Sequence, residues 1–204
     1  ALQVKGARVG VLDADIYGPS IPTMLGATTW PETKDDRYML PVICHGIQTM
    51  SIGYLIEQDD TPMIWRGPMV TRALQQLLSD TLWDDLDYLL IDLPPGTGDI
   101  QLSLTQKTAL TGAIIVTTPQ DIALLDARKA LKMFEKVKVP ILGVIENMSA
   151  HICQQCGHEQ ALFGTGGGQN IAERYQVSLL GQLPLDISIR QQTDGGKPTV
   201  IAEP

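Results

Sequence analysis

The stretch of sequence that most constrains the fold is an apolar run that ends in an aspartate and breaks into a glycine-rich turn. Residues 88–91 read Tyr-Leu-Leu-Ile, Asp92 follows, and residues 93–99 read Leu-Pro-Pro-Gly-Thr-Gly-Asp. A short continuous apolar run is typical of a strand that is buried on both faces of a parallel sheet. Because ligands of open α/β sheets bind at the carboxyl ends of the strands, this stretch predicts a binding site after residue 92.

The residues of the turn favour Mg²⁺ and phosphate as the ligands. Asp92 is placed to hold the metal, directly or through a water molecule. Gly96 and Gly98 let the backbone approach closely, so that their N–H groups face a terminal phosphate. The alternative is an ordinary strand–helix connection with glycines at its caps. Two consecutive prolines make the turn more rigid than such a connection needs, which favours the phosphate interpretation.

A second strand also ends in acidic residues. Residues 7–15 read Ala-Arg-Val-Gly-Val-Leu-Asp-Ala-Asp, so Asp13 and Asp15 follow a short apolar strand. The two side chains project in opposite directions if the strand persists, and they need not share a role. The alternative for either residue is a helix cap or a turn aspartate.

Strand and helix patterns alternate along the rest of the chain. Alternation of this kind predicts βαβ units, and hence a doubly wound, mostly parallel α/β sheet with helices on both faces. The expected strands include residues 39–43, 47–55, 112–118, 139–145 and 179–183, and the expected helices are 69–82, 100–108, 121–136 and 169–175.

Asn147 follows the strand predicted over residues 139–145. An asparagine amide pairs with the N6 donor and the N7 acceptor of adenine, so Asn147 is a candidate base-contacting residue. An Asx turn is the alternative, and the residues alone leave the two even.

The cysteine pair Cys153 and Cys156 is the other feature with distinctive chemistry. A redox dithiol is disfavoured, because the pair lies in a loop well beyond the preceding strand. Zinc is a second interpretation, with His151 or His158 from the same chain or with four thiolates from two chains. A [4Fe–4S] cluster is the third, and it needs four thiolates, which two-fold pairing of identical chains would supply. The spacing leaves zinc and cluster nearly level.

A glycine-rich segment at residues 163–168, Phe-Gly-Thr-Gly-Gly-Gly, precedes the helix predicted over residues 169–175. Such a segment can hold a phosphate at a helix N-terminus. It lacks the Gly-x4-Gly-Lys-[Ser/Thr] spacing, so we expect a hinge beside the cysteine loop, which spans about residues 149–168.

Composition narrows the class of protein. A chain of 204 residues suits one domain over residues 1–204 with a sizeable core. The net charge of −8 argues against a nucleic-acid partner. No apolar run is long enough to span a bilayer and no leader pattern is visible, so we expect no membrane partner. Three cysteines are too few for a disulfide framework, which indicates a reducing, cytoplasmic setting.

Over nearly its whole length the chain resembles the Mrp/ApbC family of MinD-like P-loop ATPases, which carry iron–sulfur clusters. The similarity rests on the motif at residues 92–99, on Asp-Ala-Asp-Ile-Tyr-Gly-Pro-Ser at residues 13–20, and on the Cys-x-x-Cys pair. The resemblance implies ATP, Mg²⁺ and a [4Fe–4S] cluster that bridges a homodimer, with apo-proteins as clients, and it favours the cluster over zinc.

The resemblance also implies a role for individual residues. Asp15 would activate the attacking water, Asp13 would support Mg²⁺, and Asp92 would hold it. Gly96 would meet the terminal phosphate and Asn147 the base, beside the segment from Pro184 to Asp186. Cys153 and Cys156 would hold the cluster.

The sequence departs from the family at two places. The family's Gly-Lys-Gly-Gly-Val-Gly-Lys-Ser P-loop does not occur in it, and neither does the usual C-terminal helix. We therefore expect a truncated chain that hydrolyses ATP poorly, with full activity in the parent protein.

The expected function is iron–sulfur cluster binding and transfer, coupled to ATP in the intact protein. One alternative is a zinc-stabilised, non-hydrolysing protein-binding module. Another is a MinD/ParA-like positioning ATPase, which calls for a membrane-binding helix or a basic surface, and neither is visible.

Overall fold

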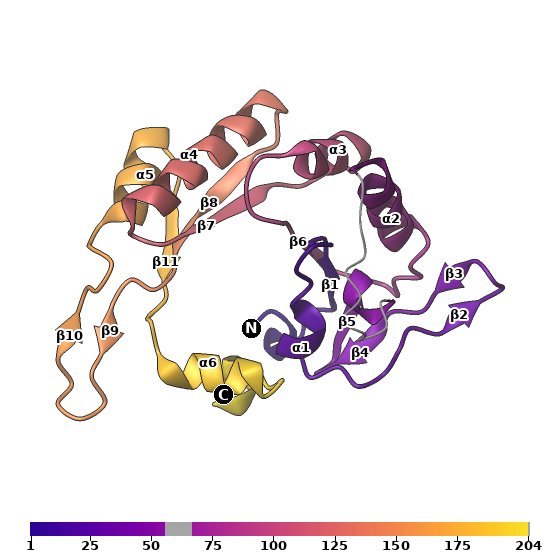
Figure 1. The fold of residues 1–204 in the computed structure, drawn as a ribbon, viewed down its shortest axis with the longest axis horizontal. Coiled ribbons are helices and arrows are strands. Elements are labelled where there is room, and N and C mark those ends of the chain that lie inside the picture. The colour runs from indigo at the N-terminus through magenta and orange to yellow at the C-terminus, as the bar shows by residue number, and fades with distance from the viewer. Residues whose placement is uncertain (56–66, 204) are drawn as a thin grey trace. The chain divides into compact units, whose positions relative to one another are not determined.

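A computed structural model describes residues 1–55 and 67–203 of the chain. The chain forms two compact units (Figure 1). The first unit comprises Ala1–Pro95 together with Ser188–Pro204, and the second comprises Gly96–Ile187. The expectation of one domain over residues 1–204 stays a prediction.

The first unit is built on a sheet of four strands. Their order is β4-β5-β1-β6, with β4 at Val42–Cys44, β5 at Ile47–Ser51, β1 at Val9–Asp13 and β6 at Tyr88–Asp92. Strand β1 runs parallel to both β5 and β6, and β4 runs antiparallel to β5. The two parallel pairings bring the carboxyl ends of β5, β1 and β6 to one edge of the sheet.

Apolar side chains from β1, β5 and the helix α2 (Gly67–Ser79) form the core of the first unit. Leu12 and Met50 are fully buried on the sheet, and Val70 and Leu77 are buried on the helix. The apolar residues of α2 recur at helical spacing, as the sequence predicts. The other elements of this unit are η1 (Gln3–Lys5), α1 (Ile21–Met24), β2 (Thr33–Lys34), β3 (Tyr38–Met39), η2 (Ile52–Tyr54), α6 (Ile187–Asp194) and α7 (Thr199–Ala202).

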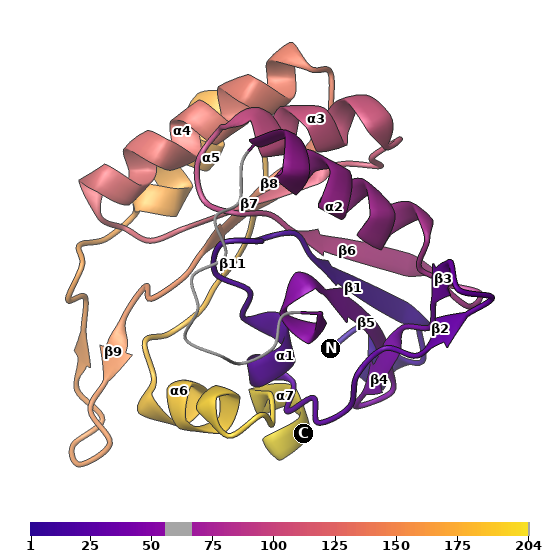
Figure 2. The same ribbon diagram turned by 45° about the vertical axis from the view of Figure 1, so that its right-hand side comes forward.

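The second unit contains a parallel sheet of three strands in the order β11-β8-β7. These strands are β7 at Ala113–Thr117, β8 at Ile141–Glu146 and β11 at Leu179–Gln182. The helices α4 (Asp121–Lys136) and α5 (Gly167–Tyr175) pack on this sheet and on each other, as Figure 2 shows. The remaining elements are α3 (Asp99–Lys107) and a small hairpin of β9 (His151–Ile152) and β10 (Glu159–Gln160).

These elements confirm the predicted α/β class with its mostly parallel strands. The pattern does not predict α6 and α7. The segment 187–194 reads Ile-Ser-Ile-Arg-Gln-Gln-Thr-Asp and carries too few apolar side chains to show helical periodicity. None of the helices in the described part of the chain is both long and apolar enough to cross a membrane.

Candidate functional site

Polar side chains meet at the carboxyl edge of the first unit's sheet. In the strand register, Asp13 of β1 lies opposite Asp92 of β6 on one side and opposite Ser51 of β5 on the other. Asp15 follows two residues after the end of β1. The sequence prediction that this edge gathers acidic groups is therefore consistent with the geometry.

Asp13 is fully buried and accepts four hydrogen bonds. Its Oδ2 accepts from the Ser51 hydroxyl at 3.0 Å and from the backbone N–H groups of Ser20 and Ile21 at 3.1 and 3.2 Å. Its Oδ1 accepts from the N–H of Asp15 at 3.2 Å. Burial raises the pKa of Asp13, and these hydrogen bonds act against that rise. Asp13 therefore holds the loop from residue 14 to residue 21 in place.

Asp15 makes a turn of its own. Its Oδ1 accepts from the N–H groups of Tyr17 and Gly18, both at 3.2 Å. This is the turn geometry that the sequence leaves open as an alternative. Among the described residues, Oδ2 of Asp15 accepts no hydrogen bond. One carboxylate oxygen thus shapes the loop while the other is available to a ligand.

Asp92 is exposed at the end of β6 and lies among like charges. Loss of hydration at this edge raises the pKa of the Asp92 carboxyl, and the negative charges of Asp13 and Asp15 raise it further. A cation at this edge would relieve the repulsion. Within residues 1–55 and 67–203, no group of three or more His, Cys, Asp and Glu side chains could hold a metal ion alone. Mg²⁺, which the family resemblance implies, typically takes one or two carboxylates together with waters and substrate phosphates.

Ser51 is the site residue that the sequence analysis misses. The apolar pattern predicts a strand through residue 55, whereas β5 ends at Ser51 and η2 follows. Ser51 is fully buried, and besides binding Asp13 its hydroxyl accepts from the N–H of Gly53 at 3.0 Å. The signal in the sequence is weak, because a serine after an apolar run has no distinctive chemistry.

Gly96, in the second unit, has a conformation that favours glycine. Its φ is +95°, and a Cβ built on it would meet nothing within 4 Å. The side-chain amide of Gln101 donates to its carbonyl at 3.2 Å. The positive φ and the open space leave its backbone accessible to a ligand, as the phosphate prediction requires.

Asn147 lies at the carboxyl end of β8. Its Oδ1 accepts from the N–H of Met148 at 2.9 Å, and its own N–H donates to the Thr117 carbonyl at 2.7 Å. In the part of the chain that the structure describes, its Nδ2 donates no hydrogen bond. The bond of Oδ1 runs to the adjacent residue and not two residues on, as an Asx turn would, and it leaves the side-chain NH₂ as a donor for a base.

The structure brings Pro184 and Asp186 beside the segment that follows Asn147. The Ser149 N–H donates to the Leu183 carbonyl at 2.9 Å, and the Leu185 N–H donates to the Ala150 carbonyl at 2.8 Å. The two segments that the sequence assigns to the base therefore lie side by side.

The cysteine pair occupies the tip of the β9–β10 hairpin. The Cys153 N–H donates to the His158 carbonyl at 2.9 Å, and the Gly157 N–H donates to the Cys153 carbonyl at 2.8 Å. The backbone N–H groups of Cys156 and Gln155 hold the pKa of the Cys153 thiol below its usual range. Cys156 is exposed and Cys153 is partly exposed, so both thiols are accessible.

No third ligand joins the pair among the described residues. These contain no metal-binding group of three His, Cys, Asp or Glu side chains. The Nδ1–H of His151 donates to the Leu185 carbonyl at 3.2 Å. The single-chain zinc site with His151 or His158 is therefore not preformed in this part of the chain.

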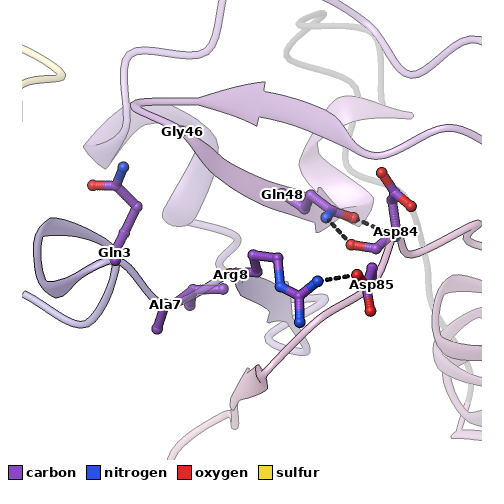
Figure 3. Close-up of a pocket in the computed structure, with 9 residues that line it drawn as sticks. Gln3, Ala7, Arg8, Gly46, Gln48, Asp84 and Asp85 are labelled. Carbon is purple, nitrogen blue, oxygen red and sulfur yellow. Dashed lines mark hydrogen bonds and ion pairs between the residues drawn. The ribbon is translucent and has the colours of Figure 1, made fainter.

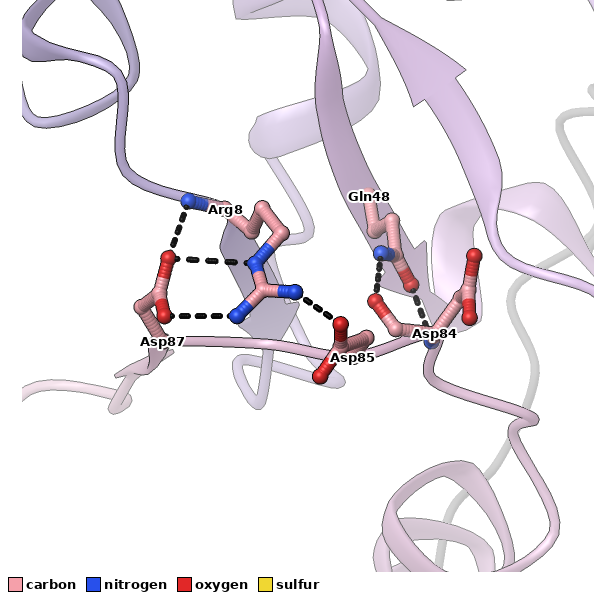
Figure 4. Close-up of polar contacts among 5 residues, drawn as sticks. All are labelled: Arg8, Gln48, Asp84, Asp85 and Asp87. Atoms are coloured by element: carbon pink, nitrogen blue, oxygen red, sulfur yellow. Dashed lines mark hydrogen bonds and ion pairs between the residues drawn. The ribbon is translucent and has the colours of Figure 1, made fainter.

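A separate pocket of about 420 Å³ lies at the amino ends of β1 and β5 in the first unit (Figure 3). Arg8 crosses it and pairs with both Asp85 and Asp87 (Figure 4). Gln48 donates to the Asp84 carbonyl at 2.6 Å and accepts from the Asp84 N–H at 2.8 Å. These contacts fasten residues 84–87 to the sheet, which gives the polar lining a structural role.

Comparisons with known proteins show the family of the chain. A family model described as "ParA: NUBPL iron-transfer P-loop NTPase" matches residues 1–204. The chain is 61% identical over 205 residues to the "Iron-sulfur cluster carrier protein" of Salmonella typhimurium, covering 100% of this chain and 55% of that protein. It is 46% identical over 197 residues to the "Iron-sulfur protein required for NADH dehydrogenase, mitochondrial" of Arabidopsis thaliana, covering 97% of this chain and 63% of that protein. The chain thus spans about half the length of the first of these relatives.

Solved structures resemble the chain as well. A nucleotide-binding protein of Archaeoglobus fulgidus in complex with ADP matches with a TM-score of 0.81 and 36% identity, covering 95% of this chain and 76% of that one. The cell division ATPase MinD of Pyrococcus furiosus matches with a TM-score of 0.68 and 22% identity, covering 100% and 81%. The second likeness shows the fold alone.

Proposed function

Because this chain belongs to the NUBPL-type family of iron-transfer P-loop NTPases, we propose that the whole protein carries iron–sulfur clusters to client apo-proteins. We propose further that it couples this transfer to ATP binding and hydrolysis. The observation that carries the proposal is the hairpin with two accessible thiols, one of them with a lowered pKa, in a chain that also presents an acidic strand edge.

The acidic edge of the first unit would serve Mg²⁺ and water. Asp92 would hold the ion, since desolvation and the nearby charges of Asp13 and Asp15 both raise its pKa and a cation would offset both effects. Asp15 would position the attacking water with its remaining oxygen. The four hydrogen bonds of Asp13 favour a role in shaping the Asp15 loop over direct support of Mg²⁺. Mg²⁺ would supply charge neutralisation at the phosphates.

We propose nucleotide-binding roles for residues of the second unit as well. Gly96 would approach the terminal phosphate with its backbone. Asn147 would contact the base through Nδ2, with Pro184 and Asp186 alongside. The ADP-bound relative from Archaeoglobus fulgidus supports nucleotide binding by this fold.

The cluster is the cargo, and Cys153 and Cys156 would hold it. A [4Fe–4S] cluster usually takes four thiolates, and this hairpin offers two. We therefore propose a homodimer in which the hairpins of two chains share one cluster, with four cysteines around a two-fold axis. The three free cysteines fit a reducing compartment, and we propose the cytoplasm.

Anaerobic reconstitution of the full-length protein with iron and sulfide tests the proposal. Iron is counted, and the molar mass is measured by light scattering on the same sample. We expect a brown dimer with about four irons per pair of chains. Cys153→Ala and Cys156→Ala should each lose the iron, whereas Cys44→Ala, at a buried thiol of β4, is the matched control that keeps it. A colourless monomer that takes one zinc would refute the carrier function and support a zinc-stabilised binding module.

A further inference from the structure

Glu146 is a buried carboxylate that the proposed chemistry does not use. It ends β8, directly before Asn147, and only 1% of its surface is exposed. Its Oε2 accepts from the backbone N–H of Gly168 at 2.5 Å, and its Oε1 accepts from the side-chain amide of Gln182 at 2.6 Å. Burial of a carboxylate is unfavourable unless hydrogen bonds satisfy it, and here both oxygens are satisfied.

The two donors, Gly168 and Gln182, lie next to the cysteine segment and next to the proposed base-contacting segment. Gly168 is in the first turn of α5, where the segment that carries the cysteine hairpin returns to the sheet. Gln182 ends β11, directly before the segment from Leu183 to Asp186. The Glu146 carboxylate therefore connects the C-terminal end of the cysteine segment to the start of the proposed base-contacting segment.

A ladder of hydrogen bonds extends from Glu146 toward the hairpin. The Glu146 carbonyl accepts from the Leu183 N–H at 2.8 Å, and the Leu183 carbonyl then accepts from the Ser149 N–H at 2.9 Å. Further along, the Ala150 carbonyl accepts from the Leu185 N–H, and His151 bonds the Leu185 carbonyl. The ladder ends where β9 begins, so the proposed base-contacting residues and the cysteine hairpin share one hydrogen-bonded ribbon.

Gly168 fits this arrangement because it has no side chain. A Cβ there would lie 2.9 Å from Cβ of Glu146 and 3.1 Å from its Oε2. The N-terminus of α5 favours an anion, and the protein's own carboxylate fills that position. Close approach of Glu146 therefore requires the glycine at position 168.

We propose that Glu146 is a positioning residue that transmits nucleotide binding at Asn147 and Pro184 to the hairpin of Cys153 and Cys156. The inference rests on the proposed role of those two residues at the base. A nucleotide base that displaces Asn147 or Pro184 would act on the ribbon at the end nearest Glu146. There Glu146 bonds Gln182, which precedes Pro184, and Gly168, where the chain re-enters α5 after the cysteine hairpin. Loss of the carboxylate leaves the buried Gly168 N–H without an acceptor and releases the side-chain amide of Gln182 from β8, so the start of the ribbon loosens.

Hydrogen exchange of the full-length protein, with and without ADP, tests the coupling. In the wild type we expect ADP to slow exchange of the amides in residues 149–168 by about tenfold. In Glu146→Ala this response should disappear, while ADP still binds with a dissociation constant within about threefold of wild type. Glu146→Gln should restore the response, because its amide oxygen can accept from Gly168 and its NH₂ can donate to a rotated Gln182 amide.

Two further variants complete the test. Glu173→Gln changes an exposed glutamate of α5 and should behave as wild type. If Glu146→Ala fails to fold, Gln182→Leu removes one donor only and should weaken the response. The proposal is overturned if ADP leaves the hairpin unchanged in the wild type, if Glu146→Ala responds fully, or if Glu146→Gln behaves as Glu146→Ala. Iron content and ADP affinity are measured separately, so failure of the carrier function is distinguishable.

Discussion

Asp13 and Asp15 are separated by one residue, yet their different surroundings indicate different roles. Asp13 is fully buried with four donors around it, and Asp15 uses a single oxygen to close a turn. A matched pair of asparagine substitutions can therefore separate structure from chemistry. The amide keeps one oxygen at each position and removes the charge.

Asp13→Asn should reduce stability. In the wild type both carboxylate oxygens accept from donors, whereas in the variant an NH₂ group replaces one oxygen and faces N–H or O–H groups that it cannot bond. We expect the free energy of unfolding to fall by about 1–3 kcal/mol, measured by denaturant titration. In the 204-residue chain the three tryptophans all lie within residues 1–95, so their fluorescence reports the first unit.

Asp15→Asn should leave stability within about 0.5 kcal/mol, because its amide oxygen still accepts from Tyr17 and Gly18. ATP hydrolysis by the full-length protein should fall by about 10²–10⁴-fold, the range of a lost general base or water-positioning group. Equal effects of the two substitutions on both stability and hydrolysis would contradict this division of roles.

The position of the acidic residues at this strand edge could be predicted from the sequence. Asp13 and Asp92 each end an apolar run, so their place at the strand edge follows from the pattern. Ser51 could not be found, because apolar residues continue past it to residue 55 and hide the end of β5. The bonding of Asp13 could not be found either, since it depends on a backbone turn that brings residues 20 and 21 back to the carboxylate.

At the scale of elements, the backbone of the β9–β10 hairpin lowers the pKa of the Cys153 thiol that the hairpin carries. The N–H groups of Cys156 and Gln155 face the sulfur of Cys153 and stabilise its thiolate, as oriented backbone donors do for other anions. Both N–H groups belong to the turn between β9 and β10.

Alkylation of the reduced chain by iodoacetamide should reveal the lowered pKa of Cys153. Because a lowered pKa means more thiolate at a given pH, the rate at Cys153 should rise at lower pH than that of a cysteine in an unstructured peptide, whose pKa is about 8.5. Peptide mass spectrometry resolves the sites, and buried Cys44 serves as the unreactive control. A Cys153 profile that coincides with the peptide would count against the hairpin geometry.

The returning helices α6 and α7 depend on one close backbone contact. A Cβ on Gly196 would lie 2.4 Å from Cα of Gly26, and Gly196 has a φ of +71°. His45 Nε2–H also donates to the Gly196 carbonyl at 3.0 Å. Sequence periodicity could not predict this packing, because it relies on an absent side chain and not on an apolar stripe.

Gly196→Ala should therefore lower the stability of the first unit by about 1–3 kcal/mol, from strain at positive φ and from the forced separation of the two backbones. Thermal unfolding followed by tryptophan fluorescence measures the loss. The control is Gly18→Ala in the same unit, where an added Cβ would lie 3.7 Å from the Asp15 carboxylate and φ is outside the left-handed region, so stability should hardly change. A neutral Gly196→Ala would show that the contact is not maintained in solution.

For the molecule as a whole, acid acts in opposite directions on different carboxyls. The Arg8 guanidinium and backbone N–H lower the pKa of Asp87 to about 2, whereas burial raises the pKa of Asp13 and of Asp92. A carboxyl with a lowered pKa stabilises the folded state at pH values above the pKa that it has in the unfolded chain, and this stabilisation is lost as the pH falls through its folded-state pKa. A carboxyl with a raised pKa destabilises the folded state while it is charged, and protonation at lower pH removes this destabilisation.

Asp87→Asn should remove the loss of stability that the wild type shows between about pH 4 and pH 2. Denaturant unfolding at a series of pH values in this window, for both proteins, gives the comparison. The variant should be less stable than wild type at neutral pH, and the two curves should converge as the pH approaches 2. Parallel curves would mean that the pair with Arg8 contributes nothing to folding.

The first unit is assembled from two pieces of chain, residues 1–95 and 188–204, with the whole second unit between them. A ribosome releases the chain from its amino end, and domains generally fold as they emerge. The second unit therefore has all its residues once position 187 has left the exit tunnel. Residues 1–95 of the first unit are made before the second unit, yet the first unit must wait for α6 and α7 before Gly196 can meet Gly26, so of these two units the one that starts earlier is completed later.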